Sequence, residues 1–284
     1  MADTIFAGQA DSTFVIQIIL SFFVGGGLIT LLSMISERVS ERISGIVMMF
    51  PSVIIIGFFF LGLTSSADQV AEVIPATLIP LGLVIFSSAI YIYSAIFYSG
   101  FIKSRYLQIA LTFLTGSLVW LLLAAPFAIW KFSNLPVGVV GYFLFIALTH
   151  FLMNRVKFTE KLSRPKYTKI QILARAAFTG TMIAAVVFLG RVLDPFWGGI
   201  FTMFPSVSYA SLVIFNIYYP PQRLFYFFKK APLGSISLLI YSLCVILLFP
   251  KLGVVWGTLA CCGISMSYSF LLIGYKLRFS GNSQ

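Results

Sequence analysis

Two copies of a Phe-Pro-Ser sequence are the residues of this chain whose types and spacing best suit solute binding. A proline inside a helix has no N–H to donate and clashes with the carbonyl four residues earlier. Carbonyls freed in this way inside a membrane need a water, another donor or a ligand, and serine hydroxyls beside them both donate and accept. The residues predicted to bind are Val47, Phe50, Pro51 and Ser52 in the first copy and Phe201, Phe204, Pro205 and Ser206 in the second.

The two copies belong to a longer repeat. The decapeptide SGIVMMFPSV, residues 44–53, recurs 154 residues later as GGIFTMFPSV, residues 198–207, with seven of ten positions identical. Glycines recur at the same offset, and such small residues let membrane helices approach closely. The glycines predicted to serve this close packing are Gly26 and Gly45 in the first half and Gly180 and Gly199 in the second. The sequence therefore predicts an internal duplication.

The composition places these motifs in a membrane. Of the 284 residues, 60% are hydrophobic and only 10% are charged, against roughly 25% charged in a soluble domain. The mean hydropathy is +1.01. About 20 apolar residues span a bilayer, and we predict an all-α polytopic protein with nine spans. The apolar runs are Phe14 to Ile35, Ser44 to Leu63, Val73 to Phe97, Leu107 to Trp130, Val137 to Met153, Ile172 to Leu189, Gly198 to Ile217, Leu233 to Phe249 and Leu252 to Tyr275.

The basic residues predict the orientation of these spans. Sixteen of the 19 Lys and Arg residues fall in the connections after the first, third, fifth and seventh runs or in the C-terminal tail. The positive-inside rule then places the N-terminus outside the cell and the C-terminus in the cytoplasm. We therefore predict a multi-pass protein of the inner (plasma) membrane. The net charge of +11 is explained by topology, so we expect the lipid bilayer and not a nucleic acid as partner. Nothing in the sequence decides for or against a homo-oligomer.

Nine spans with a repeat offset of five spans, an odd number, predict an inverted duplication. The first run crosses inward and the sixth crosses outward, so runs one to four pair with runs six to nine around a fifth, connecting helix. The predicted divisions are residues 1–132, 133–169 and 170–284. Each proline lies about eight residues into its run, roughly 12 Å deep at 1.5 Å per residue. Inverted-repeat secondary transporters build midplane sites from broken helices of this kind.

Charged residues flank the motifs at corresponding places. Glu41 and Arg42 are predicted to lie at the cytoplasmic surface of the membrane, and Arg191 and Asp194 at the outer surface. They could form latches that break when each side opens, or they could anchor helix ends in the interface. In the same way, Phe50 and Phe204 could be gates or core packing residues. Both pairs of alternatives stay open at the level of sequence.

The residues that are missing narrow the function. No acid or base lies at the centre of a predicted span, which disfavours proton relay through a buried carboxylate. The chain has no nucleophile with a base, paired carboxylates or metal-ligand cluster, so we expect no enzymatic activity and no cofactor or metal. Free carbonyls and hydroxyls suit Na⁺ or K⁺, whereas helix N-termini suit an anion. The lack of intramembrane acids favours a small anionic or neutral polar solute, and a non-transporting scaffold or accessory subunit is the alternative.

The motif also carries a resemblance to a known family. The stretches Gly45 to Val53 and Gly199 to Val207 resemble the signature of the small bacterial GlpM-like membrane proteins, in which a glycine and a hydrophobic stretch lead into Phe-Pro-Ser or Phe-Pro-Thr on the second span. Those proteins carry one copy per chain. The resemblance implies that this chain is a fused, inverted version of a pair. Because the family is associated with alginate production, it also implies an accessory role in envelope polysaccharide export.

Overall fold

The regular structure of this protein is helical. The computed structural model describes residues 2–37, 49–154 and 168–279, and within these ranges no strand occurs. The helices are α1 (Ala2–Glu37), α3 (Ser52–Thr64), α4 (Ala67–Ser99), α5 (Arg105–Ile129), α6 (Leu135–Asn154), α7 (Lys169–Val192), α8 (Pro195–Thr202), α9 (Ser206–Tyr218), η1 (Pro221–Arg223), α10 (Leu224–Phe228), α11 (Ala231–Gly234) and α12 (Ile236–Phe279).

Seven helical segments in the described part of the chain are long and apolar enough to cross a membrane. The protein is therefore a multi-pass helical membrane protein, as its composition predicts. Two of the nine predicted runs do not appear as separate members of these seven segments. The helical part of the second run in the described residues is α3, which has 13 residues, and nearly all of the last two runs lies within α12.

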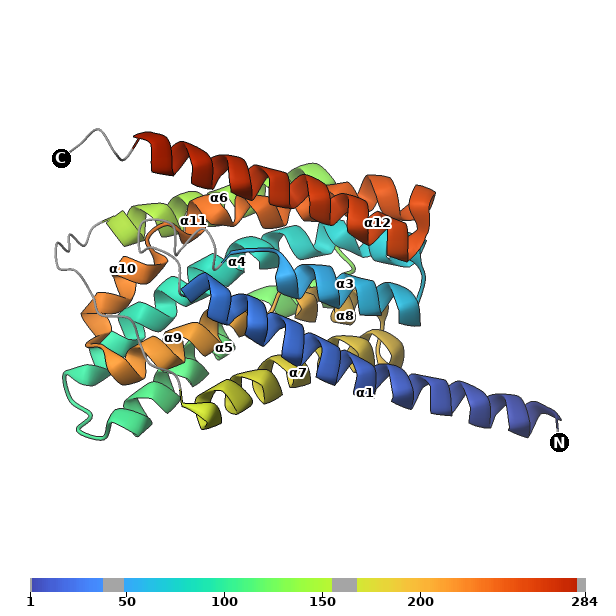
Figure 1. Cartoon of the computed structure of the whole chain (residues 1–284), viewed down its shortest axis with the longest axis horizontal. Helices are drawn as coiled ribbons and strands as arrows, with labels where there is room; N and C mark the ends of the chain where they lie inside the picture. The colour runs from blue at the N-terminus through green and yellow to red at the C-terminus, as the bar shows by residue number, and fades with distance from the viewer. Residues whose placement is uncertain (1, 38–48, 155–167, 280–284) are drawn as a thin grey trace.

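Helix α12 contains a sharp turn between the last two predicted runs. Gly253 has the left-handed φ of 71°, which glycine adopts at low cost. Figure 1 shows the orange limb of α12 running to this turn and the red limb returning beside it. The hydroxyl of Tyr268 in the second limb donates to the carbonyl of Leu233 in α11 over 3.3 Å, so the second limb returns to the place where the first limb begins.

Helix α4 forms the centre of the bundle. It packs against α5, α6 and α12, and most of its length is buried. Pro75 and Pro80 lie inside α4 without ending it. The outer helices instead expose large apolar side chains, among them Phe23, Leu122 and Leu271, which suits contact with lipid tails.

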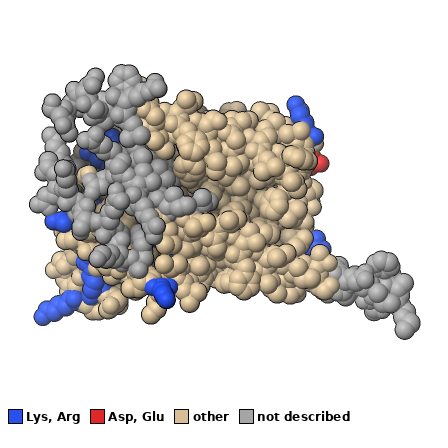
Figure 2. Space-filling view, in the orientation of Figure 1, with Lys and Arg blue, Asp and Glu red and all other residues tan. Residues whose placement is uncertain are grey.

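Charged residues lie toward the two ends of the bundle. In Figure 2, blue Lys and Arg atoms and red Asp and Glu atoms are seen near the ends, and the belt between them is tan. The α3–α4, α5–α6 and α7–α8 connections share one end, and the α4–α5 connection and the end of α9 share the other (Figure 1). An apolar belt between polar ends is the surface that a bilayer requires.

Helices α1 and α7 run in opposite directions and meet at two glycines (Figure 1). A methyl group added to Gly26 would lie 2.5 Å from the carbonyl oxygen of Ala176, and one added to Gly180 would lie 2.5 Å from the carbonyl oxygen of Phe22. Each glycine thus faces the residue four positions before the other glycine. Such reciprocal contacts arise between antiparallel helices whose backbones touch, and they leave no room for a side chain.

One connection differs from the sequence expectation. The stretch between the seventh and eighth predicted runs was expected to be a cytoplasmic loop, but it folds as η1, α10 and α11. The side chains of Leu224, Phe225 and Phe228 in α10 are at most 2% exposed. This basic segment packs into the core because burying its aromatic side chains has a lower free energy than leaving them in water.

Candidate functional site

Both Phe-Pro-Ser motifs place a helix start at the same position. Pro51 precedes α3 with φ −75° and ψ 29°, and Pro205 precedes α9 with φ −72° and ψ 44°. Each helix begins at the motif serine and runs for 13 residues. In the second copy, α8 ends at Thr202, so the apolar run is interrupted at the motif. The residues that precede the first motif, 38–48, lie outside the described part of the chain.

The interruption does not leave the carbonyl that we expected to be free. The carbonyl of Phe201 accepts the N–H of Phe204 over 2.9 Å, in a tight turn that replaces the missing helical bond. The expectation for Phe201 is corrected accordingly, and Val47 lies outside the described residues. The motif turn closes in the same way in both copies. The N–H of Ser52 donates to the carbonyl of Phe50 over 2.8 Å, and the N–H of Ser206 donates to the carbonyl of Phe204 over 2.7 Å.

The two motifs, far apart in the sequence, line one cavity between α3, α4, α9 and α12. Its volume is about 40 Å³, enough for roughly three water molecules at 10–15 Å³ each. Phe50 comes from the first copy, and Phe204, Pro205 and Ser206 come from the second. Pro51, Ser52 and Phe201, which were also predicted to bind, are not among the described residues that line it.

Two helix N-termini meet at this cavity. Val53 and Ile54, the second and third residues of α3, line it together with Val207 and Ser208, the corresponding residues of α9. Proline stands at the cap position of each helix and makes no side-chain cap hydrogen bond among the described residues. The first amides of a helix have no intrahelical acceptor, and their partial positive charge attracts anions and carbonyl oxygens. No acidic residue is among the described residues that line the cavity.

Ser206 adds a hydroxyl to this arrangement. Its side chain is 1% exposed, and its Oγ has no hydrogen-bond partner among the described residues. An unsatisfied buried hydroxyl costs roughly 1–3 kcal/mol unless a ligand or water supplies the bond. Ser52 is also buried, at 8% exposed. The Ser206 hydroxyl therefore lacks a hydrogen bond that a solute bound in the cavity would supply.

Aromatic side chains fix the position of Phe204. Its ring lies edge-on to Trp120 at 5.2 Å, to Tyr209 at 5.9 Å and to Phe178 at 6.4 Å. Trp120 is fully buried and reaches Phe204 from α5. Among the described residues, the Phe50 ring pairs with that of Phe270, with the ring centroids 5.9 Å apart. No local sequence pattern pointed to Trp120 in this role, because Trp120 lies far from the second motif in the chain.

The predicted packing glycines lie in different surroundings. A methyl group on Gly199 would collide with the Val73 side chain, so this glycine lets α8 approach α4. Gly26 and Gly180 face each other at the α1–α7 crossing described above. Gly45 lies outside the described residues.

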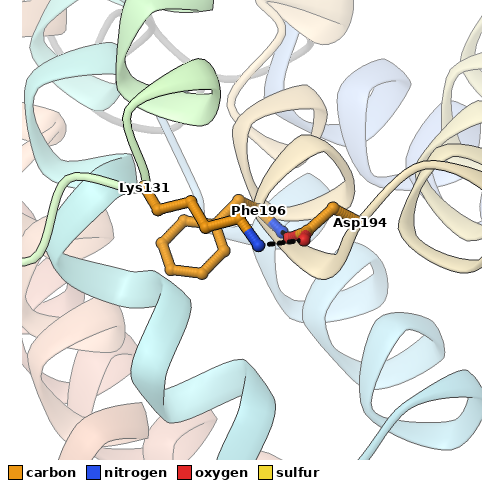
Figure 3. A network of polar contacts seen from close by, with 3 residues as sticks. All are labelled: Lys131, Asp194 and Phe196. Carbon is orange, nitrogen blue, oxygen red and sulfur yellow. Dashed lines mark hydrogen bonds and ion pairs between the residues drawn. The ribbon is translucent and has the colours of Figure 1, made fainter.

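An ion pair joins the two halves of the chain at the end opposite the basic connections. Lys131, between α5 and α6, has its Nζ 2.5 Å from Oδ2 of Asp194 (Figure 3). The other carboxylate oxygen of Asp194 accepts the N–H of Phe196 and caps α8. Lys131 also lies over the Phe196 ring, 5.7 Å from its centroid. Of the predicted latch residues, Asp194 pairs with Lys131 and not with Arg191, while Glu41 and Arg42 lie outside the described part of the chain.

Removing either charge of this pair should lower the free energy of unfolding slightly, and removing both charges should lower it no further. Asp194→Asn keeps a capping oxygen, so it tests the charge and not the cap. Since the Lys131 side chain is 59% exposed, we expect Asp194→Asn and Lys131→Gln each to cost roughly 0.2–1 kcal/mol. The double variant should cost no more than either single one when unfolding is measured at low salt, with Lys251→Gln as control. Additive costs would show that the two charges act independently.

Comparisons with known proteins add no relative. No family model, curated protein or solved structure matches this chain. The resemblance to the GlpM-like proteins therefore rests on the motif residues alone, and function has to be inferred from the shared cavity and its surroundings.

Proposed function

We propose that this protein is a secondary transporter that binds a small anionic or neutral polar solute at the cavity between its two motifs. The observation that carries the proposal is the convergence of two uncapped helix N-termini, α3 and α9, on one cavity that contains no described acidic residue. Both helix dipoles would favour a negative charge or an acceptor oxygen there. Inverted-repeat transporters use half-helix N-termini at the midplane for the same purpose.

The proposal includes nine spans in two inverted repeats. It is supported by α3 and α9, which have equal lengths and the same proline geometry. It is also supported by the antiparallel α1 and α7, and by the Gly253 turn, which divides α12 into two limbs. In the repeat register the C-terminal end of α4 corresponds to this turn, so α4 would pair with the segment from η1 to the first limb of α12. Helix α6 would be the connector.

The proposed orientation puts the N-terminus outside and the C-terminus in the cytoplasm. It predicts that a cysteine replacing Ser133, between α5 and α6, reacts with an impermeant thiol reagent in intact cells. A cysteine replacing Ser104, between α4 and α5, should react only after permeabilisation. Both serines are exposed, and Cys244, Cys261 and Cys262 are at least partly buried, so the unsubstituted protein is the background control. Equal labelling at both positions in intact cells would reject the topology.

The volume of the cavity limits the solute. At about 40 Å³ it would hold a small ion or a solute of a few atoms, and a larger one would require the helices to move. The Lys131–Asp194 pair joins the two halves at one end of the bundle. Under alternating access, this pair would have to open whenever the cavity is exposed to that side.

Replacing Ser206 tests the site without a prior choice of substrate. Because its hydroxyl lacks a described partner, Ser206→Ala should leave the ligand-free protein as stable or more stable. The same change should weaken solute binding by about tenfold or less, since one hydrogen bond is lost. A thermal-shift screen of ions and small anions on the purified protein measures both effects, and Ser267→Ala, whose exposed hydroxyl bonds within its own helix, is the control.

The screen also separates transport from the alternative. An accessory subunit has no reason to be stabilised by any solute through Ser206. If no ion or small anion shifts the wild-type melting temperature more than that of Ser206→Ala, the transport proposal fails and the accessory role in polysaccharide export becomes the working hypothesis.

A further inference from the structure

Helix α5 turns a polar face toward the interior of the bundle, between one end of the bundle and the motif cavity. Its buried residues in this half include Gln108, Thr112, Gly116 and Trp120, spaced four residues apart. Residues at this spacing lie on one side of a helix. Beyond Trp120 the same side carries only alanines at these positions. The polar groups are thus confined to the half of α5 that begins at the α4–α5 connection.

Two side chains of this face carry buried polar atoms without a bond. Thr112 Oγ1 and Trp120 Nε1 have no hydrogen-bond partner among the described residues, and both side chains are fully buried. Ser206 Oγ, at the motif cavity, is in the same situation. Nearly all buried polar groups in folded proteins are bonded to protein, water or ligand. The indole N–H of Trp120 can only donate, so the partner that it requires is an acceptor.

Helices α4 and α9 bring further polar groups to this face. A methyl group added to Gly116 would lie 2.6 Å from the hydroxyl oxygen of Tyr209 and 3.6 Å from the carbonyl oxygen of Ser87. The Tyr209 hydroxyl of α9 therefore enters between α5 and α4 at this glycine. The rings of Tyr209 and Tyr91 are 5.6 Å apart, and Tyr91 lies beside the Asn216 side chain. We call the following residues the polar column: Tyr91 on α4, Thr112, Gly116 and Trp120 on α5, and Tyr209 and Asn216 on α9.

Arg105 closes the end of the polar column. It is the first residue of α5, and its guanidinium donates to the carbonyls of Asn216 and Tyr219 at the end of α9. It also lies close enough to Tyr91 to interact with it electrostatically. From Ser206 to Asn216, α9 rises by roughly 15 Å at 1.5 Å per residue, which is half of a ~30 Å hydrocarbon core. The column therefore connects the motif cavity with the end of the bundle at Arg105.

We propose that the solute is an anion and that it passes along the polar column between the motif cavity and the end of the bundle at Arg105. The inference rests on the proposed transport function and narrows its solute from anionic or neutral to anionic. Hydroxyl and indole groups in the column can donate to an anion, no member of the column is acidic, and a guanidinium at its end attracts negative charge. When this end opens, Arg105 releases the carbonyls of α9, as the Lys131–Asp194 pair opens at the other end.

Cysteine reactivity tests whether solvent reaches the polar column. Purified Thr112→Cys protein is treated with a small charged methanethiosulfonate, and mass spectrometry follows the modification. Ala89→Cys is the matched control, because Ala89 is fully buried on α4 and, two residues before Tyr91, points to another side of that helix. Thiols react as thiolates, which apolar surroundings suppress, so Thr112→Cys should react at least ~10-fold faster than Ala89→Cys. The unsubstituted protein measures the background from the natural cysteines.

The same thiol reports on the end at Arg105 and on the charge of the solute. Arg105→Gln should raise the rate at Thr112→Cys, whereas Lys131→Gln, which removes a cation at the opposite end, should not. The anionic sulfonatoethyl reagent should be favoured over the cationic trimethylammonioethyl reagent by ~10-fold, the rate gain that a lining of one sign gives to an opposite charge. Each rate is first divided by the rate of the same reagent with free cysteine.

Thr112→Phe separates the path from the binding site. The ring would fill the polar column but would leave Ser206 and both helix N-termini at the motif cavity in place. Thermal shifts by the solute should therefore persist, while uptake into proteoliposomes should be lost. Leu114→Phe, at a lipid-exposed position of α5, is the matched control and should transport. If Thr112→Phe fails to fold, the cysteine rates decide the question.

The path is rejected if Thr112→Cys reacts no faster than Ala89→Cys, with or without Arg105→Gln, or if folded Thr112→Phe takes up the solute at the wild-type rate. An equal or higher normalised rate with the cationic reagent rejects the anion. The proposed function survives these results as long as a solute binds through Ser206. Conversely, if no solute binds but the thiol of Thr112→Cys reacts as expected, the transport proposal fails, while anion-selective access along the polar column stands.

Discussion

Gly180→Ala should destabilise the protein by about 1–3 kcal/mol, the cost of overpacking a close contact. The added methyl group would lie 2.5 Å from the carbonyl oxygen of Phe22 and 3.1 Å from its ring. A backbone oxygen cannot move aside cheaply, so α1 and α7 would have to separate. Gly26→Ala meets the carbonyl of Ala176 at the same distance, and we expect a similar cost. Reversible unfolding in mixed micelles measures both.

Gly27→Ala is the matched control for this pair. Gly27 lies on the same helix, and an added methyl group would meet nothing within 4 Å. Because alanine favours a helix over glycine by about 1 kcal/mol, this change should be neutral or stabilising. If Gly26→Ala and Gly180→Ala behave like Gly27→Ala, the α1–α7 crossing is not the close backbone contact described here. A large cost for only one of them would contradict the reciprocal geometry that supports the inverted repeat.

Much of the helical framework could be predicted because membrane helices have a simple sequence signal. In the described residues, each predicted apolar run is helical over most of its length, since a chain in hydrocarbon must satisfy its backbone groups internally. The break between the last two runs was predicted near Lys251, and the structure turns at Gly253. The signal fails for the segment Pro221–Gly234. Its positive charges suggested a loop, and its aromatic residues nevertheless fold into the core.

The helix break at the motif shows what a proline alone cannot predict. Pro80 lies inside α4 and Pro126 inside α5, and both helices continue through them. Pro205 instead stands at a break, where the Phe204 ring is held by Trp120 and its neighbours. Repetition of the motif pointed to the two prolines that directly precede α3 and α9. The aromatic packing that accompanies the second break involves residues remote in the sequence, and so it could not be predicted.

The candidate site was predicted in part for the same reason. The duplication predicted that the two motifs lie together, and residues of both line one cavity. The chemistry is different from the prediction in detail, because the turn at Phe204 occupies the carbonyl of Phe201. What the cavity offers is helix N-termini and the Ser206 hydroxyl. The Lys131–Asp194 pair and the bonds of Arg105 to α9 depend on tertiary contacts that no local pattern records.

Pro205→Ala should abolish transport while leaving the protein folded. Alanine restores an N–H at position 205, and this N–H can donate to the carbonyl of Phe201 in place of the turn bond from Phe204. Helices α8 and α9 would then tend to join, and the N-terminus of α9 would no longer be open to the cavity. Removing a helix-interior proline relieves up to about 3 kcal/mol in a regular helix, so stability should hold or rise. Pro51→Ala should have the same effect through α3.

Pro80→Ala separates this mechanism from a general effect of proline. Pro80 lies inside α4, which is continuous, so its replacement changes no helix N-terminus at the cavity. The measurement is uptake, in proteoliposomes, of the solute found in the thermal-shift screen, with unfolding followed in parallel. We expect uptake to be retained in Pro80→Ala and lost in Pro51→Ala and Pro205→Ala. Because the two prolines serve one cavity, the double variant should be no more impaired than either single one. Uptake at the wild-type rate in Pro205→Ala would mean that the interrupted helix is a structural kink and that the solute crosses elsewhere.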